Sequence, residues 1–367
     1  MAFILSFLGK GGTGRTTVAL AAARSMAHQG KRVLLASQDL GLALRSQLGL
    51  EAMGMDPQPI EPHLDGVQLQ AASLLSQSWE EAKALEAQYL RTPFLTSVFG
   101  QELGILPGMG DALILYWLKN MDASDRYDAI VFDGSDSQAT LRMFGIPEVG
   151  GWYARRFKKV FDESDFARTV MPLLQPIAAT VLSSADLFGN NFSQPMNQVD
   201  GILEQGQRAI ADPTRVSAYL VTTADPVAQQ TAQWLWGGAQ QVNLTVGGVI
   251  LMPSREDHAL GSGFSPLPIH PMPQIQAAND AALVAALPHF AEEVKAAPRP
   301  LIIDEVQRQV KAFLPGFTKA QVKLTQYGPE LTIEAGDQRR NIDLPPTLRG
   351  KRVKGAKFQD SYLIISL

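Results

Sequence analysis

The sequence predicts an α/β protein with a parallel sheet, followed by a small all-β domain. In the N-terminal part, short apolar runs alternate with longer helical patterns, which is typical of parallel strands joined by crossover helices. After residue 300 the pattern changes to short strands separated by turns, which is typical of an all-β domain. The length of 367 residues also exceeds the usual size of one domain.

The first 36 residues predict one complete strand–helix–strand unit. A strand is expected over residues 2–8, an alanine-rich helix over 16–28 and a second strand over 32–36. Further strands, with helices between them, are expected at residues 67–71, 129–132, 217–222 and 246–251. Because ligands of such open sheets bind at the carboxyl ends of the strands, we expect the functional site there.

Changes in the sequence pattern indicate how the chain is divided into domains. Helical segments interrupted by proline and glycine, rich in Phe, Leu and Met, replace the alternation at about residues 149–212. We therefore predict an α/β domain over 1–294 that contains this helical insertion, a linker over 295–300, and a β-domain over 301–367. Strands of the β-domain are expected at residues 322–325, 331–334, 341–344 and 362–367.

Charge also divides along the chain. Residues 299–367 carry 12 basic and 7 acidic side chains, a net charge of +5, which leaves −9 for residues 1–298. This bias predicts an acidic partner for the C-terminal domain, although most such bias is only a solvated surface. Nothing in the sequence indicates nucleic-acid binding.

Composition excludes several kinds of site and location. The chain has no cysteine, which excludes disulfides and thiolate metal sites, and its five histidines stand far apart. The longest uncharged run, residues 169–185, is shorter than the ~20 apolar residues of a membrane span, so no integral membrane segment is expected. The apolar N-terminus lacks the basic residues of a secretory signal. We expect a soluble cytoplasmic protein, or one of an organellar stroma if a transit peptide has been removed.

A glycine-rich loop, G-K-G-G-T-G-R-T-T at residues 9–17 (the glycine loop), joins the first expected strand to the first expected helix. Its glycines let successive backbone N–H groups point at one spot, and the helix N-terminus adds a positive dipole, so the loop suits phosphate. The Thr16 hydroxyl suits a magnesium ion. We expect ATP or ADP with Mg²⁺ to bind Gly9, Lys10, Gly11, Gly12, Thr13, Gly14, Arg15, Thr16 and Thr17. A dinucleotide fingerprint and a turn without ligand are weaker alternatives.

The segment from Lys10 to Thr16 resembles the deviant Walker A loop of the signal-recognition, MinD and BioD class of P-loop NTPases. In that class the early lysine reaches the partner's nucleotide, so the resemblance implies a homodimer in which Lys10 acts in trans. Arg15 departs from the pattern, which has lysine there. A guanidinium can bind phosphate bidentately but is planar and bulkier than an ammonium group, so we expect binding to survive and phosphoryl transfer to suffer.

Two segments narrow the resemblance to the ArsA and guided-entry (GET) ATPase family. Asp133 ends an apolar strand, as a magnesium-binding aspartate does, and the T-L-R of residues 140–142 follows it, as in switch II of that family. The segment P-G-M-G-D-A at 107–112 resembles the family's P-G-x-x-E-A. The resemblance implies that Thr16 and Asp133 hold Mg²⁺.

Switch I of that family resembles the segment that ends at Asp39. The resemblance implies catalytic roles for Lys10, Asp39 and Asp133. The family's water-orienting aspartate aligns with Ser46, so we expect slow hydrolysis or the use of another carboxylate, Asp39 or Asp136. Two residues of a later loop, Pro266 and Leu267, resemble the family's adenine-packing loop, and an ordinary loop is the alternative.

The C-terminal domain resembles the α-crystallin fold of small heat-shock proteins. The resemblance rests on L-P-G-F at residues 314–317 and on the four strands expected after it. That fold is a β-sandwich whose edges and grooves accept extended segments. The whole chain resembles the crystallin-bearing branch of the ArsA/GET family known from photosynthetic organisms. The predicted fold is therefore a deviant Walker A P-loop NTPase with a helical insertion, plus an α-crystallin-like sandwich.

This resemblance implies a dimeric chaperone or targeting factor that binds an apolar protein or peptide client according to its nucleotide and hydrolyses ATP slowly. A nucleotide-gated binding module with negligible turnover is the alternative. An arsenite pump is disfavoured because cysteine is absent, and a MinD-like protein because a terminal amphipathic helix is absent. The helical insertion supplies the expected client surface, although such a cluster can also be an ordinary core. The expected client residues are Phe166, Met171, Leu174, Phe188 and Met196.

Overall fold

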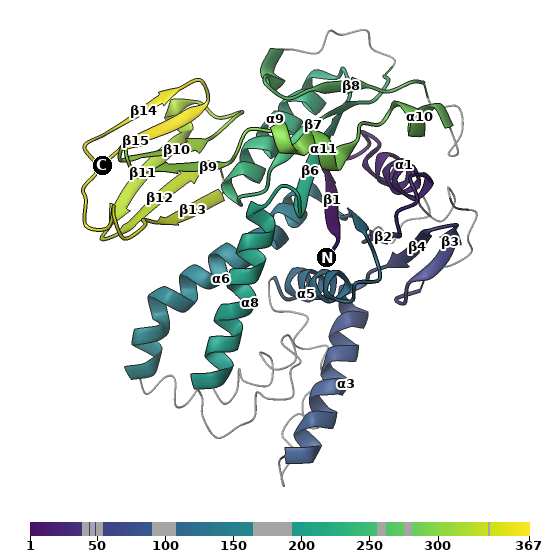
Figure 1. Ribbon diagram of the computed structural model, residues 1–367, viewed down its shortest axis with the longest axis horizontal. Coiled ribbons are helices and arrows are strands. Elements are labelled where there is room, and N and C mark those ends of the chain that lie inside the picture. The colour runs from purple at the N-terminus through teal and green to yellow at the C-terminus, as the bar shows by residue number, and fades with distance from the viewer. Residues whose placement is uncertain are drawn as a thin grey trace.

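The computed structural model describes residues 1–38, 44, 48, 54–89, 108–163, 193–254, 262–274, 281–336 and 338–367. Helices cover both faces of a central sheet, and a small β-domain lies beside the α/β domain (Figure 1). This arrangement confirms the predicted fold class.

The central sheet has eight strands in the order β3-β4-β2-β5-β1-β6-β7-β8. All neighbouring strands in it are parallel except β3 and β4, which are antiparallel. The two edge strands β3 and β8 were not predicted, because their short exposed segments lack an apolar run. The bounds are β1 Phe3–Leu8, β2 Val33–Ser37, β3 Gln58–Glu61, β4 Leu64–Gln68, β5 Ala129–Asp133, β6 Val216–Thr222, β7 Val246–Leu251 and β8 Ile269–Pro271.

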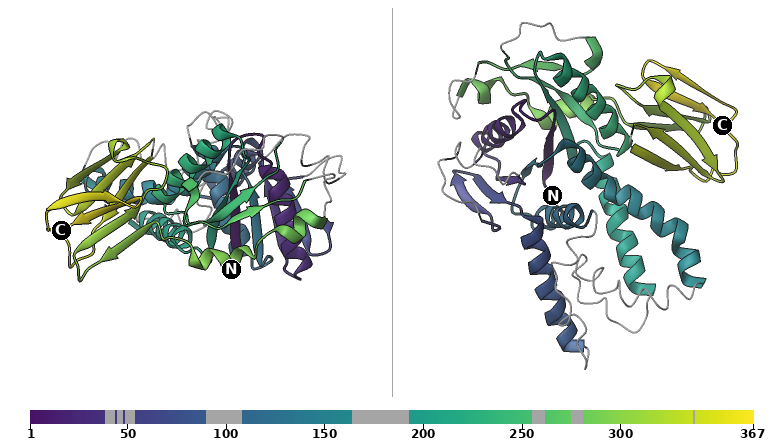
Figure 2. Two further views of the ribbon diagram at one scale, coloured as in Figure 1. Left: turned by 90° about the horizontal axis from the view of Figure 1, so that it is seen from above. Right: turned by 180° about the vertical axis from the view of Figure 1, so that it is seen from behind.

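Alternating side chains of the strands pack against two layers of helices. In β1, Leu5 and Phe7 pack on the face of α1, α10 and α11, whereas Ile4 and Leu8 pack on the face of α5, α6, α8 and α9 (Figure 2). The α-helices are α1 Arg15–His28, α3 Ala71–Tyr89, α5 Met109–Ala123, α6 Ser137–Glu163, α8 Ser193–Ala211, α9 Pro226–Gln241, α10 Ala281–Ala286 and α11 Phe290–Glu293. Short 3₁₀ helices are Ser262–Phe264, Val294–Ala296 and Lys319–Gln321.

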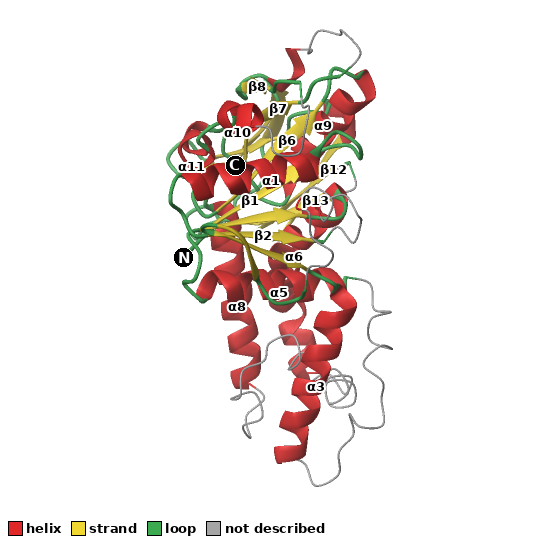
Figure 3. Cartoon of the chain, turned by 90° about the vertical axis from the view of Figure 1, so that its right-hand side faces the viewer, coloured by secondary structure: helices red, strands yellow, loops and turns green. Residues whose placement is uncertain are grey.

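Helices α3, α6 and α8 extend well beyond the sheet on one side (Figure 3). The helical insertion was predicted to start at about residue 149, but α6 already begins at Ser137 and continues through Pro147. The start of the insertion is thus one continuous helix with the segment that follows β5. Within the described ranges, none of the helices combines the length and the apolar character that crossing a bilayer requires.

The β-domain consists of two antiparallel sheets, with the orders β14-β15-β10-β9 and β11-β12-β13. Val310, Ile333 and Ile365 are fully buried between them, as the predicted sandwich requires. Strands β9, β10 and β14 were not predicted, since they are short and β14 is almost entirely exposed. The bounds are β9 Leu301–Asp304, β10 Gln309–Phe313, β11 Val322–Tyr327, β12 Glu330–Ala335, β13 Gln338–Asp343, β14 Gly355–Gln359 and β15 Tyr362–Ser366.

The β-domain packs closely against the end of α9. A methyl group added at Gly237 would overlap the ring of Phe317, so only glycine permits this approach. The buried guanidinium of Arg340 donates hydrogen bonds to the carbonyl of Gln240 (3.0 Å) and to Oδ1 of Asn243 (2.6 Å). Burial lowers the pKa of Arg340 to about 10. The Arg340 guanidinium also donates to the carbonyl of Pro300 at 3.4 Å. The end of the segment that was predicted to be a linker is therefore packed against the β-domain.

Substitution of Arg340 tests whether this contact fixes the β-domain. Arg340→Ala should lower the free energy of unfolding by about 3 kcal/mol, because two or three buried carbonyl oxygens lose a charged donor. Its exposed neighbour Arg339 is the matched control, and Arg339→Ala should cost less than about 1 kcal/mol. Denaturant unfolding measures both. Equal effects of the two substitutions would contradict the assigned role of Arg340.

Candidate functional site

The glycine loop follows β1 at the carboxyl end of the sheet and leads into α1. Gly12 and Gly14 have φ angles of 83° and 93°, a left-handed conformation that favours glycine. The backbone N–H and the hydroxyl of Thr13 both donate to the carbonyl of Lys10, at 3.3 and 2.8 Å. These bonds close the loop into a tight turn.

One side of the loop is packed and the other is open. A methyl group at Gly9 would overlap the carbonyl oxygen of Val221, and one at Gly14 would lie 3.1 Å from Met252. A methyl group at Gly11 or Gly12 would meet no described atom within 4 Å. Among the described residues no side chain caps the start of α1, so its first N–H groups remain available. The open side therefore suits an anion at a helix N-terminus.

Gly9 and Gly11 form a matched pair that tests this geometry. Gly9→Ala should lower the melting temperature by several degrees and abolish nucleotide binding, because the loop must shift away from Val221. Gly11→Ala should leave the melting temperature unchanged, since its added methyl group meets open space. Scanning fluorimetry with and without Mg-ADP measures both. A Gly9→Ala protein with unchanged melting temperature and binding would contradict the close approach.

Asp133 ends β5, the neighbour of β1, and its side chain is 3% exposed. The Ser37 hydroxyl at the end of β2 donates to Oδ2 of Asp133 at 3.2 Å. The Gln38 N–H donates to the backbone carbonyl of Asp133 at 2.9 Å. Thr16 lies in the first turn of α1 and is half-buried. A carboxylate and a hydroxyl are the hard oxygen donors that Mg²⁺ prefers, so these residues fit the predicted metal.

Arg15 contacts the segment of residues 133–142, which runs from the last residue of β5 into α6 and which we call the switch segment. Its Nη1 donates to the carbonyl of Gly134 and to the hydroxyl of Ser137, both at 3.3 Å, and its Nη2 donates to the carbonyl of Ser135 at 3.2 Å. In this structure the guanidinium is therefore engaged with the switch segment.

Ser137, the first residue of α6, also connects the glycine loop with the switch segment. Its hydroxyl accepts from the N–H of Gly9 and lies within donating distance of the Gly9 carbonyl, both at 3.0 Å. Ser137 was not predicted as a site residue, because a serine at the start of a helix is typical of a cap. The actual cap is Asp136, whose Oδ1 accepts from the N–H groups of Gln138 and Ala139.

The two family-like segments lie near each other. Asp111, in the first turn of α5, belongs to the P-G-M-G-D-A segment, and Arg142 belongs to the switch segment. Burial raises the pKa of Asp111, and the positive charge of Arg142 opposes this rise. The start of α5 and the second turn of α6 are thus electrostatically linked.

The remaining predicted residues are placed as follows. Lys10 is an exposed residue of the glycine loop. Leu267 is 5% exposed and packs in the core, whereas Pro266 is exposed. Other predicted residues lie outside the described part of the chain, namely Asp39, Ser46, Phe166, Met171, Leu174 and Phe188. Met196 belongs to α8, but its side chain is also outside the described part.

Comparison with known proteins gives two family matches. A family model described as an anion-transporting ATPase (ArsA ATPase) matches residues 1–257, and one described as an HSP20-like domain found in ArsA matches residues 305–367.

Among individual relatives, a putative arsenical pump-driving ATPase of Chlorobaculum tepidum is 25% identical, with 99% of this chain and 95% of that protein aligned. A putative arsenical pump-driving ATPase of Aquifex aeolicus is 20% identical, with 99% of each chain aligned. The arsenical pump-driving ATPase of Escherichia coli is 28% identical over 40% of this chain and 26% of its own length.

Proposed function

This chain belongs to the ArsA ATPase family and carries an HSP20-like domain, and from that premise we propose that it is a homodimeric ATPase whose nucleotide state controls binding of an apolar protein or peptide client. The observation that supports the proposal best is the direct connection from the glycine loop through Arg15 and Ser137 to α6. Hydrolysis is proposed to be slow.

Arg15 is the proposed link between nucleotide and helix. Its guanidinium would exchange the switch-segment carbonyls for phosphate oxygens, because charge-assisted hydrogen bonds to phosphate are stronger than those to neutral carbonyls. The switch segment would then lose three hydrogen bonds, one of them at Ser137, and the start of α6 could adopt a second position. The exposed apolar side chains of Val149 and Tyr153 lie on α6 and would move with it.

Thr16 and Asp133 are proposed to hold the magnesium ion, which would neutralise phosphate charge when bound. Lys10 is proposed to act across a dimer interface, since it is an exposed residue of the glycine loop. Two such loops facing each other would bring several phosphate charges together, and a lysine from each protomer would offset them.

The client is proposed to bind at residues of the predicted helical insertion, Phe166, Met171, Leu174, Phe188 and Met196. Apolar fluorescent probe binding tests this, measured with ADP and with a non-hydrolysable ATP analogue. We expect the two nucleotides to give different probe affinities and Met171→Asp to weaken binding. Val306→Asp is the matched control, because Val306 is 93% exposed and belongs to the β-domain, outside the predicted client segment. Equal binding in both nucleotide states, unaffected by Met171→Asp, would refute the client site.

A binding module with negligible ATP turnover is the second candidate. The engagement of Arg15 with three switch-segment acceptors favours it, because the guanidinium must leave them before it can contact phosphate. A steady-state ATPase assay separates the two candidates. The names of several relatives mention arsenical pumps, but this chain has no cysteine to offer a metalloid a thiolate, so we do not propose that activity.

An acidic partner is further proposed for the β-domain. Lys311, Lys351, Arg352 and Lys357 form no ion pair with any described carboxylate, so their charge is available at the surface.

A further inference from the structure

A cavity of about 460 Å³ lies between α5, α6 and α8, next to the amino-terminal ends of β1 and β6. The glycine loop lies at the opposite, carboxyl end of the sheet, so this cavity is separate from the nucleotide site. Its walls are largely apolar and include Leu115, Leu118, Phe144, Ile146, Ile202 and Leu203. Its volume falls in the range of about 300–1,000 Å³ that is usual for small-molecule sites.

The apolar wall is only partly covered by protein. Leu115 on α5 and Ile202 and Leu203 on α8 are half-buried, although their helices flank one another around the cavity. Apolar side chains that line an unfilled space forgo contacts that a ligand of the right shape would supply. The cavity therefore favours an apolar ligand.

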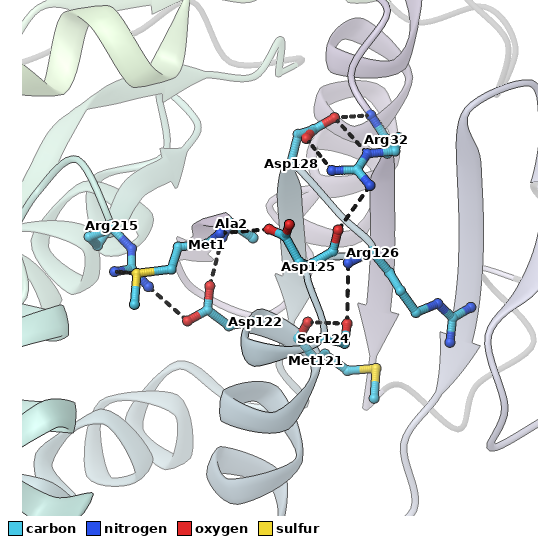
Figure 4. Close-up of polar contacts among 10 residues, drawn as sticks. All are labelled: Met1, Ala2, Arg32, Met121, Asp122, Ser124, Asp125, Arg126, Asp128 and Arg215. Atoms are coloured by element: carbon cyan, nitrogen blue, oxygen red, sulfur yellow. Dashed lines mark hydrogen bonds and ion pairs between the residues drawn. The ribbon is translucent and has the colours of Figure 1, made fainter.

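Charged groups stand at the edge of the cavity. Arg215 donates from Nη2 to Oδ2 of Asp122 at 2.7 Å, and Oδ1 of Asp122 accepts from the N–H of Ala2 at 2.6 Å (Figure 4). The Nε atom of Arg215 is buried and has no hydrogen-bond partner among the described residues. This network closes the cavity toward β1 and β6 and leaves one donor unused.

Lys119 supplies a positive charge to the lining of the cavity. Its Nζ lies 5.2 Å from the centre of the Tyr116 ring, and no described carboxylate forms an ion pair with it. The two other basic side chains of the lining are paired, Arg208 with Glu204 at 2.8 Å and Arg215 with Asp122 at 2.7 Å. An anionic group at the edge would therefore find Lys119 available.

A whole helix of 20 residues is a poor match for this cavity. A helix of 20 residues is about 30 Å long and at least 10 Å wide, which corresponds to a volume on the order of 2,000 Å³. That is more than the cavity can enclose. A single extended hydrocarbon chain is narrow enough to enter it.

We propose that this cavity binds a single-chain amphiphile with an anionic head. Its acyl chain lies among α5, α6 and α8, and its carboxylate or phosphate lies at Lys119. This goes beyond the proposed function, because the ligand is a small amphiphile and not a protein client.

The test is displacement of the fluorescent fatty acid cis-parinaric acid from the full-length protein without nucleotide, so a failure leaves the proposed function untouched. We expect one saturable site per chain. Competing acids from octanoic to dodecanoic should bind about fourfold more tightly for each added methylene group. Lys119→Ala should weaken the binding of dodecanoic acid at least fivefold but leave the binding of dodecanol unchanged. Lys295→Ala is the matched control, because Lys295 is a surface lysine next to α11 on the other face of the sheet.

Two variants that fill or polarise the cavity complete the test. Ala209→Phe should remove binding because its ring fills the cavity. Ile202→Asp should also remove binding, and it still tests the proposal if the Ala209→Phe protein fails to fold. Stronger displacement by lysophosphatidic acid than by hexadecanoic acid would assign a phosphate head, and the reverse a carboxylate head. Absence of saturable binding, or binding that survives Ile202→Asp, would overturn the proposal.

Discussion

Lys10→Ala is expected to abolish ATP hydrolysis while leaving the nucleotide affinity of a single protomer within a few-fold of wild type. Lys10 is exposed beside the glycine loop, and its side chain forms no ion pair with a described carboxylate that would occupy it. In the proposed dimer it neutralises charge on the partner's nucleotide during phosphoryl transfer, a contribution worth several powers of ten in rate. Binding within a protomer depends on the backbone of the loop and does not require this lysine.

Mixing two inactive variants tests whether Lys10 acts in trans. Asp133→Asn removes the metal ligand of its own site but retains Lys10, whereas Lys10→Ala retains Asp133. In a one-to-one mixture, the site of the Lys10→Ala protomer receives the partner's Lys10, so about a quarter of the wild-type activity should return. Lys10→Ala alone is the control. Full activity of that variant, or a mixture that stays inactive although heterodimers form, would refute the in-trans role.

Arg15→Lys is expected to increase the rate of ATP hydrolysis about tenfold, which corresponds to about 1.4 kcal/mol of activation free energy. The guanidinium fork of Arg15 holds three acceptors of the switch segment at once. An ammonium group is a point charge that cannot bridge them in the same geometry, so lysine leaves the switch segment freer to move. The positive charge remains, so nucleotide affinity should be at least that of wild type.

Ser137→Ala provides the matched comparison for Arg15→Lys. It removes the hydroxyl that bridges Arg15 and Gly9 but leaves both carbonyl contacts of Arg15 in place, so its effect on the rate should be smaller. Steady-state turnover measures all three proteins. A wild-type rate of about 1 s⁻¹ or more, or a slower Arg15→Lys protein, would show that Arg15 does not restrain the switch segment.

Local patterns predicted the central strands well, because they are buried on both faces and therefore read as continuous apolar runs. In β5 and β6 every residue is buried, and both were placed within one residue of their bounds. By contrast, β3 (Q-P-I-E) and β14 (G-A-K-F-Q) lie at sheet edges and are largely exposed. Hydrogen bonding to a neighbour makes them strands, and a single segment does not encode that neighbour.

The candidate site also has one part that the sequence predicts and one part that it does not. The glycine loop was predicted from nine consecutive residues, since its chemistry depends on local backbone freedom. The contacts of Arg15 join residues about 120 positions apart, so the loop alone gives no sign of them. A guanidinium can donate to phosphate or to carbonyl oxygens, and the fold decides which acceptor lies within reach.

Hydrogen–deuterium exchange tests most directly whether nucleotide at the glycine loop moves α6. Two peptides are followed, one covering residues 9–17 and the other residues 134–149, without nucleotide, with Mg-ADP and with Mg²⁺ plus a non-hydrolysable ATP analogue. We expect both nucleotides to protect the glycine loop, and the ATP analogue to change exchange at the start of α6 relative to ADP. Identical exchange of residues 134–149 in both nucleotide states, with the glycine loop protected in each, would contradict the account.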